Sequence, residues 1–187
     1  SGIFPTVGGM RPIGTSCLIE DVAFPVEDLP EATVKMQQII HDHGYDEGCI
    51  YGHAFEGNYH FILNQSFKEP KEVDRYADMM RDIIKLVKSY DGSLKAEHGT
   101  GRNMAPFVRE EWGDEAFDAM RRLKEIFDPE GLLNPGVIFN ENPNCFIRNL
   151  KHLPELDYDF SQLPDGNEYA ERMKSPKSTT QETIDGV

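Results

Sequence analysis

Cysteine is scarce in this 187-residue chain, and the three cysteines that it has follow no regular spacing. Cys17, Cys49 and Cys145 are odd in number, far apart and without any Cys-x-x-Cys pair. Such a set indicates neither a disulfide framework nor a thiolate metal site, because both need paired or closely spaced cysteines. Since disulfides are absent from the expected structure, the cytoplasm is the compartment that the sequence favours.

Long apolar runs and basic charge are also in short supply. No apolar stretch approaches the roughly 20 residues that span a bilayer, and the first residues lack the charged-then-apolar order of a secretion signal. The chain carries 19 basic and 33 acidic residues, and its formal net charge of -14 repels phosphate backbones and anionic membrane surfaces. We therefore expect a soluble protein whose general partners include neither nucleic acid nor a membrane.

A glycine-rich nucleotide-binding segment between a strand and a helix is missing as well. The chain begins Ser1-Gly2-Ile3-Phe4 without an initiator methionine, as expected for a segment that starts within a longer sequence. The residues that are present suffice for one folded domain, because 39% of them are hydrophobic and 10% aromatic.

Apolar periodicity, together with proline and glycine at the ends of the periodic segments, predicts an alternation of strands and helices. The expected elements are a loop over 1–16, a strand over 17–24, a helix over 29–43, a hairpin with strands 49–53 and 59–63, a helix from Pro70 to the Asp91-Gly92 turn, a short strand over 94–96 and a helix from about Asp114 to Phe127.

Two of these strands form a hairpin, so the sheet should be antiparallel or mixed, with helices packed on one face. The predicted fold class is α+β with a ferredoxin-like layer, and the predicted domain covers residues 1–140. Residues 141–187 contain several prolines and are expected to form an extended tail or linker, disordered over 165–187. The apolar stripe of the last helix is expected in the core; its members are Phe117, Met120, Leu123, Ile126 and Phe127.

The most informative pattern is a pair of histidines followed later by a Glu-His pair. His53 and His60 are seven residues apart in Gly-His-Ala-Phe-Glu-Gly-Asn-Tyr-His, and Glu97 and His98 come after them. Imidazole nitrogen and carboxylate oxygen suit a divalent ion such as Zn²⁺, and three protein ligands with one open position are typical of catalytic zinc sites. An odd spacing puts two residues on opposite faces of one strand, but a turn at Gly57-Asn58 lets both histidines face one site. Packed, hydrogen-bonded structural histidines are the alternative interpretation.

Three segments in order carry a family resemblance: His53–His60, the Glu-His-Gly-Thr-Gly-Arg segment 97–102, and Phe-Asp-Pro-Glu-Gly-Leu-Leu-Asn-Pro-Gly at 127–136. They resemble the signatures of the C-terminal domain of FAD-linked oxidases of the D-lactate dehydrogenase, glycolate oxidase and D-2-hydroxyglutarate dehydrogenase type. The similarity runs from about Arg11 to Phe139. Phe55-Glu56 stands where the commoner family form has Gly-Asp, a variation that resembles the D-lactate dehydrogenase branch.

The resemblance implies a role for each matched residue. His53, His60 and Glu97 would hold a divalent metal, zinc or manganese, and His98 would be the catalytic base. Reasoning from the residues alone leaves Glu97 and His98 interchangeable. The substrate would be bound by Arg11, Thr15 and Asn58, and the cofactor would be contacted by Arg102 and Asn134. For these five residues a surface charge or an ordinary turn is the alternative.

The implied function is that of the substrate- and metal-binding part of an FAD-dependent D-2-hydroxy-acid dehydrogenase, inactive without the N-terminal FAD-binding domain of the same full-length protein. A divalent ion lowers the pKa of the substrate hydroxyl, and a histidine, with an unperturbed pKa of about 6.5, can take the proton. Segment 149–154 resembles the stretch that precedes an iron-sulfur cluster domain in some relatives, although this chain holds no cysteine cluster. A metal-dependent hydrolase and a non-enzymatic acidic interaction module are the competing hypotheses.

Overall fold

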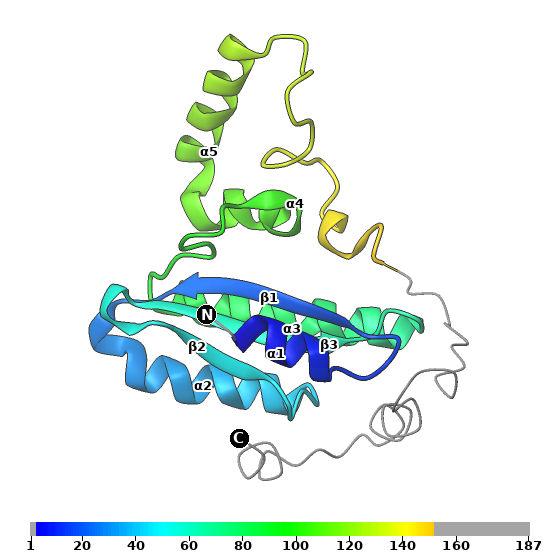
Figure 1. Ribbon diagram of the computed structural model, residues 1–187. Helices are drawn as coiled ribbons and strands as arrows, with labels where there is room; N and C mark the ends of the chain where they lie inside the picture. The colour runs from blue at the N-terminus through cyan, green and yellow to red at the C-terminus, as the bar shows by residue number, and fades with distance from the viewer. Residues whose placement is uncertain (1–2, 152–187) are drawn as a thin grey trace, which may run out of the picture.

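Strand β3 (Asn58–Gln65) is the centre of a three-stranded sheet, with β1 (Ser16–Ala23) and β2 (Cys49–His53) on its two sides. A computed structural model describes residues 3–151, and both strand pairings are antiparallel (Figure 1). The sequence of β3 explains its central place, because it is rich in aromatic and branched residues and is buried along most of its length. The predicted α+β class is confirmed.

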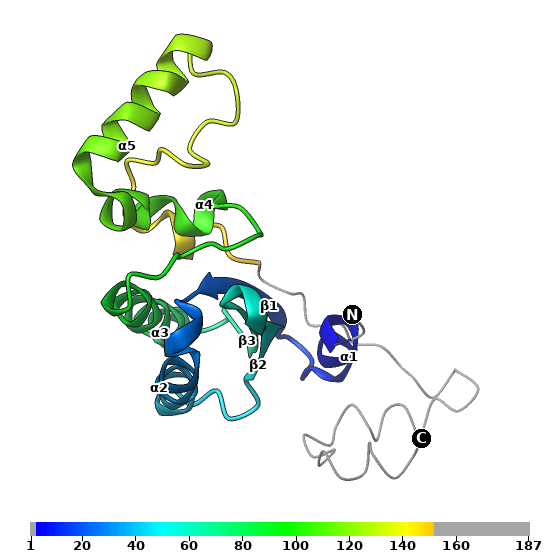
Figure 2. The same ribbon diagram turned by 90° about the vertical axis from the view of Figure 1, so that its left-hand side faces the viewer.

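Helices α2 (Leu29–Asp42) and α3 (Pro70–Ser89) cover one face of the sheet (Figure 2). Both begin close to a proline in the first turn, and α3 also has a capping box between Glu69 and Glu72. Phe61 and Leu63 point from β3 into the core that these helices enclose. The α3 residues that face the sheet repeat at three-to-four spacing: Tyr76, Met80, Ile83 and Val87. Both predicted helices are confirmed.

The order of elements is that of a ferredoxin-like unit, but its last strand is reduced to one bridge. Ser93 pairs with Ala23 at the outer edge of β1, and the chain then bends. The predicted strand over 94–96 is therefore wrong. Its backbone N–H groups are satisfied by side chains instead of a ladder: Glu111 accepts from Leu94, and Asp21 accepts from Ala96.

The expectation of a loop over residues 1–16 is also wrong in part, because Ile3–Met10 form helix α1. This segment has no helical apolar period and contains Pro5, Gly8 and Gly9, so local propensity disfavours a helix. Packing overrides propensity here. A side chain at Gly8 would come within 3.9 Å of Cys17 on the opposite face of the sheet from α2 and α3, and Figure 2 shows α1 on that side.

Helix α5 (Val108–Phe127) projects away from the sheet (Figures 1 and 2). Its backbone is kinked at Gly113, so the regular part starts at the predicted Asp114. Phe117 is buried, but Leu123, Ile126 and Phe127 are 56%, 74% and 77% exposed. The prediction that this stripe lies in the core is therefore wrong for its C-terminal half. No helix among residues 3–151 is both long and apolar enough to cross a membrane.

The part of the predicted tail that the structure describes packs back on the domain. Phe146, in the short turn Cys145–Ile147, is buried, and its ring centre lies 5.1 Å from that of Phe107. The boundary at residue 140 stays a prediction. The predicted disorder over 165–187 and the second half of the segment 149–154 lie outside the described residues.

The connection between β2 and β3 covers residues 54–57, so the turn does not include Asn58 of the predicted Gly57-Asn58 pair. Residues Ala54–Glu56 form a 3-10 turn, Gly57 has a left-handed φ of 70°, and Asn58 is already the first residue of β3. The Gly57 carbonyl accepts a hydrogen bond from the Phe24 N–H at 2.9 Å. Packing against Phe24 therefore shapes the loop between the two histidines.

Replacing Gly57 by alanine should destabilise the chain more than replacing Gly131, which has a similar φ of 66°. A Cβ at Gly57 would lie 2.1 Å from the Phe24 carbonyl oxygen, whereas at Gly131 it would meet no atom within 4 Å. Both substitutions cost about 1–3 kcal/mol of backbone strain. The Gly57 clash should add about 1–3 kcal/mol. Urea unfolding of both variants measures the difference, and equal costs would show that the hairpin loop is not held against Phe24.

Candidate metal and substrate site

The two histidines of the hairpin lie on the same face of the sheet. His53 pairs with Asn58 across the β2–β3 ladder, and Asn58 is two residues before His60, so strand alternation places all three on one face. The two imidazole rings are 5.5 Å apart and nearly perpendicular. The prediction that a chain reversal lets both histidines face one site is confirmed.

Glu97 and His98 join the histidines from the loop that follows Ser93. Glu97 Oε1 lies 2.9 Å from His60 Nε2 and 3.5 Å from His53 Nε2. The His98 ring stacks on the His60 ring with 4.8 Å between centroids, and His98 Nε2 is 3.9 Å from Glu97 Oε1. The four residues that the sequence motifs singled out as ligands and base are thus brought together.

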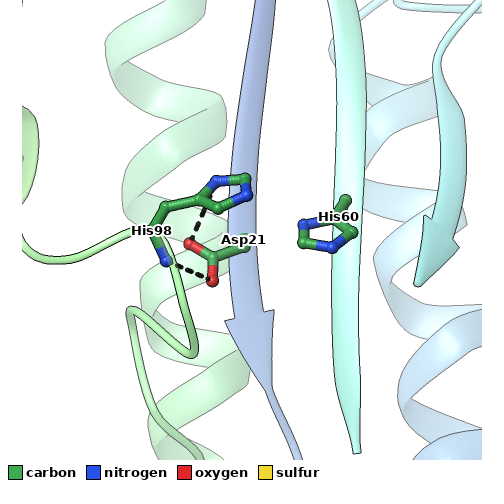
Figure 3. A group of neighbouring side chains, drawn as sticks. All are labelled: Asp21, His60 and His98. Atoms are coloured by element: carbon green, nitrogen blue, oxygen red, sulfur yellow. Dashed lines mark hydrogen bonds and ion pairs between the residues drawn. The ribbon is translucent and has the colours of Figure 1, made fainter. Parts of the chain in front are cut away.

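Asp21, which the sequence motifs did not reveal, is the central residue of the site (Figure 3). It lies on β1 directly opposite His60, and its side chain is fully buried. Its Oδ2 accepts backbone N–H groups from Ala96 at 3.0 Å, Glu97 at 2.7 Å and His98 at 3.3 Å. A signal was present in the sequence, because Glu20-Asp21 interrupts an otherwise apolar strand.

A second set of buried polar contacts fixes the same loop from the other side of β1. Lys95 Nζ lies 2.5 Å from Glu20 Oε2 and 3.4 Å from Asp21 Oδ1. Asn103, in the short helix α4 (Gly101–Met104), donates its amide to Glu20 Oε1 at 2.6 Å. Side chains of β1, the loop and α4 therefore form one connected network.

Burial and neighbouring groups determine the pKa values of Asp21 and His60. Burial alone would raise the pKa of Asp21, but the Glu97 N–H, the Lys95 ammonium and the neighbouring His98 outweigh it, and the net pKa lies below the usual value. Burial and the nearby His98 lower the pKa of His60, against the opposing influence of Glu97 and Asp21. A lowered pKa favours neutral imidazole, the form that binds metal.

The donor atoms of His53, His60 and Glu97 fit a single divalent ion. They all lie within 4.8 Å of one another. In a tetrahedral zinc site with bonds of about 2.0–2.1 Å, two ligand atoms are about 3.3 Å apart. Glu97 Oε1 lies 2.9 Å from one histidine nitrogen and 3.5 Å from the other, which is close to this separation. His60 Nδ1 is buried without a hydrogen-bond partner among residues 3–151.

Asp21, His60 and His98 form a second group of the same size. It suits a cation less well, because Asp21 Oδ2 already accepts three N–H groups and Oδ1 faces the ammonium of Lys95. Glu97 is half exposed and receives no such N–H or ammonium donors from residues 3–151, so within this part of the chain its carboxylate is free to coordinate. The contacts therefore favour Glu97 over His98 as the third ligand.

The predicted carboxylate-binding pair lies apart from this cluster. The Arg11 guanidinium donates to the carbonyls of Gly8 and Thr15, and the Thr15 hydroxyl donates to the Pro12 carbonyl. Ser16, next to Thr15, is five residues from Asp21 along β1, which corresponds to about 16 Å. The structure does not bring Arg11 and Thr15 to the histidine cluster within residues 3–151. Their role in substrate binding stays a prediction.

Asn58 lies beside the cluster but is buried, and its amide donates to the Val22 carbonyl at 3.2 Å. Its Oδ1 is buried without a partner among the described residues. Arg102 donates to the Pro135 carbonyl at 3.2 Å, and Asn134, the preceding residue, has a left-handed φ of 45°. The two predicted cofactor contacts, Arg102 and Asn134, are therefore close to each other.

Comparison with known proteins agrees with the family resemblance seen in the sequence. Residues 2–138 match the family model described as FAD linked oxidases, C-terminal domain. The chain is 30% identical over 123 residues to glycolate oxidase subunit GlcD of Bacillus subtilis, which covers 65% of the chain and 26% of that protein. It is 30% identical over 131 residues to mitochondrial D-lactate dehydrogenase (cytochrome) 1 of Saccharomyces cerevisiae, with 66% and 21% covered.

A D-2-hydroxyglutarate dehydrogenase of Pantoea ananatis is 31% identical over 120 residues, which are 64% of the chain and 12% of that protein. The chain thus spans about a quarter or less of the length of these relatives.

Removing the buried ammonium group of Lys95 should destabilise the folded chain. Lys95→Met would leave Glu20 and Asp21 without their ammonium partner, and breaking such a buried pair costs about 3–5 kcal/mol. Lys85→Met is the matched control, because Lys85 pairs with Asp82 at the surface, where such pairs contribute at most about 1 kcal/mol. Urea unfolding of the chain measures both changes. Equal losses would mean that Lys95 is not essential to the network.

Proposed function

Because this chain belongs to the C-terminal domain family of the FAD-linked oxidases, we propose that it is the substrate- and metal-binding domain of an FAD-dependent D-2-hydroxy-acid dehydrogenase. The reaction is the oxidation of D-lactate or a similar 2-hydroxy acid to the 2-oxo acid. The observation that carries the proposal is the convergence of His53, His60 and Glu97 on one face, with His98 stacked beside them.

Each residue has a distinct part in this proposal. His53, His60 and Glu97 would hold the divalent ion, zinc or manganese, through their imidazole nitrogens and carboxylate oxygen. When bound, the ion lowers the pKa of the substrate hydroxyl and stabilises the developing alkoxide. His98 takes the hydroxyl proton, which a neutral imidazole can do near pH 7. The flavin of the longer protein supplies the acceptor for the hydride.

The proposed partner is the FAD-binding domain of the same full-length protein. A cavity of about 510 Å³ beside α4 supports contact with an anionic cofactor, because it is lined by Arg102, Arg148 and four asparagines, with no acidic side chain among its lining residues. In a chain with a formal net charge of -14, such a lining favours a flavin phosphate over a cation. We place the protein in the cytoplasm on the grounds of its three free cysteines.

The hydrolase and the interaction module are weaker alternatives. A hydrolase could use the same three ligands, but the chain matches an oxidase family over residues 2–138. Purely structural histidines do not account for the half-exposed Glu97 carboxylate held against His53 and His60.

His60→Ala tests the function directly. The full-length protein should bind one divalent ion per chain and reduce its flavin with a D-2-hydroxy acid. His60→Ala should abolish metal binding and slow flavin reduction by about 100-fold or more, because the alkoxide loses its main electrostatic support. His41→Ala is the control, since His41 pairs with Asp46 at the surface.

Metal content by elemental analysis and flavin reduction by absorbance give the two readouts, with D-lactate, glycolate and D-2-hydroxyglutarate as substrates. Metal that is absent from the unmodified protein, or equal in both proteins under metal-replete conditions, would contradict the ligand assignment. A metal-loaded protein whose flavin none of the three acids reduces would contradict the substrate class.

We also propose that the exposed apolar ridge of α5 is covered by the FAD-binding domain. The ridge consists of Leu123, Ile126, Phe127, Leu132 and Leu133, all more than half exposed. Five large apolar side chains exposed within eleven residues are unusual on a free monomer. The family match is to a C-terminal domain, and the matched segments are 26% and 21% of the two relatives, so another part of the same protein is the natural occupant.

Phe127→Glu should therefore lower flavin reduction in the full-length protein while leaving metal binding by the chain alone unchanged. Val34→Glu, at a similarly exposed position on α2, should change neither. Amide exchange over residues 118–133 should be slower in the full-length protein than in the chain alone. Equal exchange would contradict the proposal, and a dimer of the chain that Phe127→Glu dissociates would assign the ridge to a second copy.

A further inference from the structure

We propose that Asp21 is a positioning residue that presents His98 as a proton acceptor, with one carboxylate oxygen holding the loop backbone and the other holding the imidazole. In this arrangement Nδ1 of neutral His98 carries the hydrogen and Nε2 carries the free lone pair. Asp21 acts through His98, so the assignment rests on the proposed function in which His98 takes the hydroxyl proton.

The first oxygen solves a geometric problem. Glu97 and His98 are adjacent, and in a regular strand their side chains would face opposite ways. Instead, three consecutive N–H groups, of Ala96, Glu97 and His98, converge on Oδ2 of Asp21. Successive N–H groups that point to one anion require a curved backbone. That curvature brings both the Glu97 carboxylate and the His98 ring to His60.

The second oxygen faces the imidazole. Asp21 Oδ1 lies 3.6 Å from His98 Nδ1 (Figure 3). The same oxygen lies 3.4 Å from Lys95 Nζ. The separation from Nδ1 is longer than a hydrogen bond, but catalytic hydrogen bonds are often long before substrate binds. A carboxylate only accepts, so Nδ1 must be the nitrogen that carries hydrogen. The same division of roles operates in Ser-His-Asp triads, where the buried carboxylate fixes the tautomer of the base.

His98 Nε2 then points toward the ligand side of the site, 3.9 Å from Glu97 Oε1. A hydroxyl bound beside Glu97 would meet this lone pair. When His98 takes the proton, the positive imidazolium faces the buried negative charge of Asp21, which stabilises it. Without Asp21 the base would lose its orientation and this stabilisation at once.

Asp21→Asn is the informative variant because it is nearly isosteric. Its carbonyl oxygen must keep facing the three N–H groups, so the amide NH₂ is directed at His98 Nδ1. The tautomer of His98 should therefore reverse, with the hydrogen moving to Nε2. Glu111→Gln is the matched control, since Glu111 also accepts hydrogen bonds from this loop, at Ser93 and Leu94, and within the described part of the chain it forms no hydrogen bond or ion pair with His98.

The tautomer is measured in the unmodified chain by long-range proton–nitrogen NMR of ¹⁵N-labelled histidine at a pH where His98 is neutral. The His98 signals are identified by their loss in His98→Gln. We expect the Nδ1–H form in the unmodified chain and in Glu111→Gln, and the Nε2–H form in Asp21→Asn. An Nε2–H form in the unmodified chain would overturn the proposal, whether or not the variants fold.

Activity gives an independent readout in the full-length protein. Asp21→Asn should lower kcat by about 100-fold or more, with KM and metal content close to those of the unmodified protein. Glu111→Gln should stay within about threefold. If Asp21→Asn keeps its kcat, or loses metal and thermal stability together with activity, Asp21 is only structural. If the unmodified protein oxidises no hydroxy acid, the proposed function fails, and the NMR result alone decides the role of Asp21.

Discussion

One buried carboxylate, that of Asp21, replaces the strand that would otherwise complete the sheet. Beyond Ser93 the edge of β1 has no ladder partner, and the N–H groups of Ala96, Glu97 and His98 bond to Asp21 instead. A fourth strand at this edge would have paired only every second one of these N–H groups with β1. It would also have turned Glu97 and His98 to opposite faces. The incomplete sheet is therefore the condition under which both residues reach one site.

Electrostatic balance within the site reconciles the strong acidity of the chain with the anionic substrate that we propose for it. A net charge of -14 repels a hydroxy-acid anion at long range. Within the site, however, the Glu20 carboxylate is paired with Lys95 and Asn103. The Asp21 carboxylate accepts three N–H groups and lies next to Lys95. Glu97 is the acid whose charge is left for a metal ion, and a divalent ion more than neutralises it. Metal binding would thus change the local field from repulsive to attractive.

Local signals in the sequence predicted the elements, and long-range packing decided the rest. The period of α2 and α3, the β2–β3 hairpin and the meeting of His53 with His60 all follow from residues close in sequence. Asp21 was missed because its place opposite His60 depends on the β1–β3 register, which joins residues 39 apart. The stripe of α5 was misplaced because periodicity shows that one face is apolar without showing what covers it. Helix α1 forms against its propensity because Gly8 packs on Cys17.

The exposed fractions of the four clustered side chains indicate from which side the proposed substrate would reach them. The His60 side chain is 6% exposed and forms the floor, whereas those of His98, Glu97 and His53 are 35%, 48% and 63% exposed. Helices α2 and α3 close one face of the sheet, and α1 covers the other face near Cys17 (Figure 2). Among residues 3–151, the side of Glu97 and His53 is the side left open to the proposed substrate. In the proposed reaction the hydride acceptor would approach from the same side, because the reacting carbon would lie beyond the hydroxyl that faces His98 and the ligands. The proton and the hydride would therefore leave the substrate in different directions, the first into this domain and the second away from it.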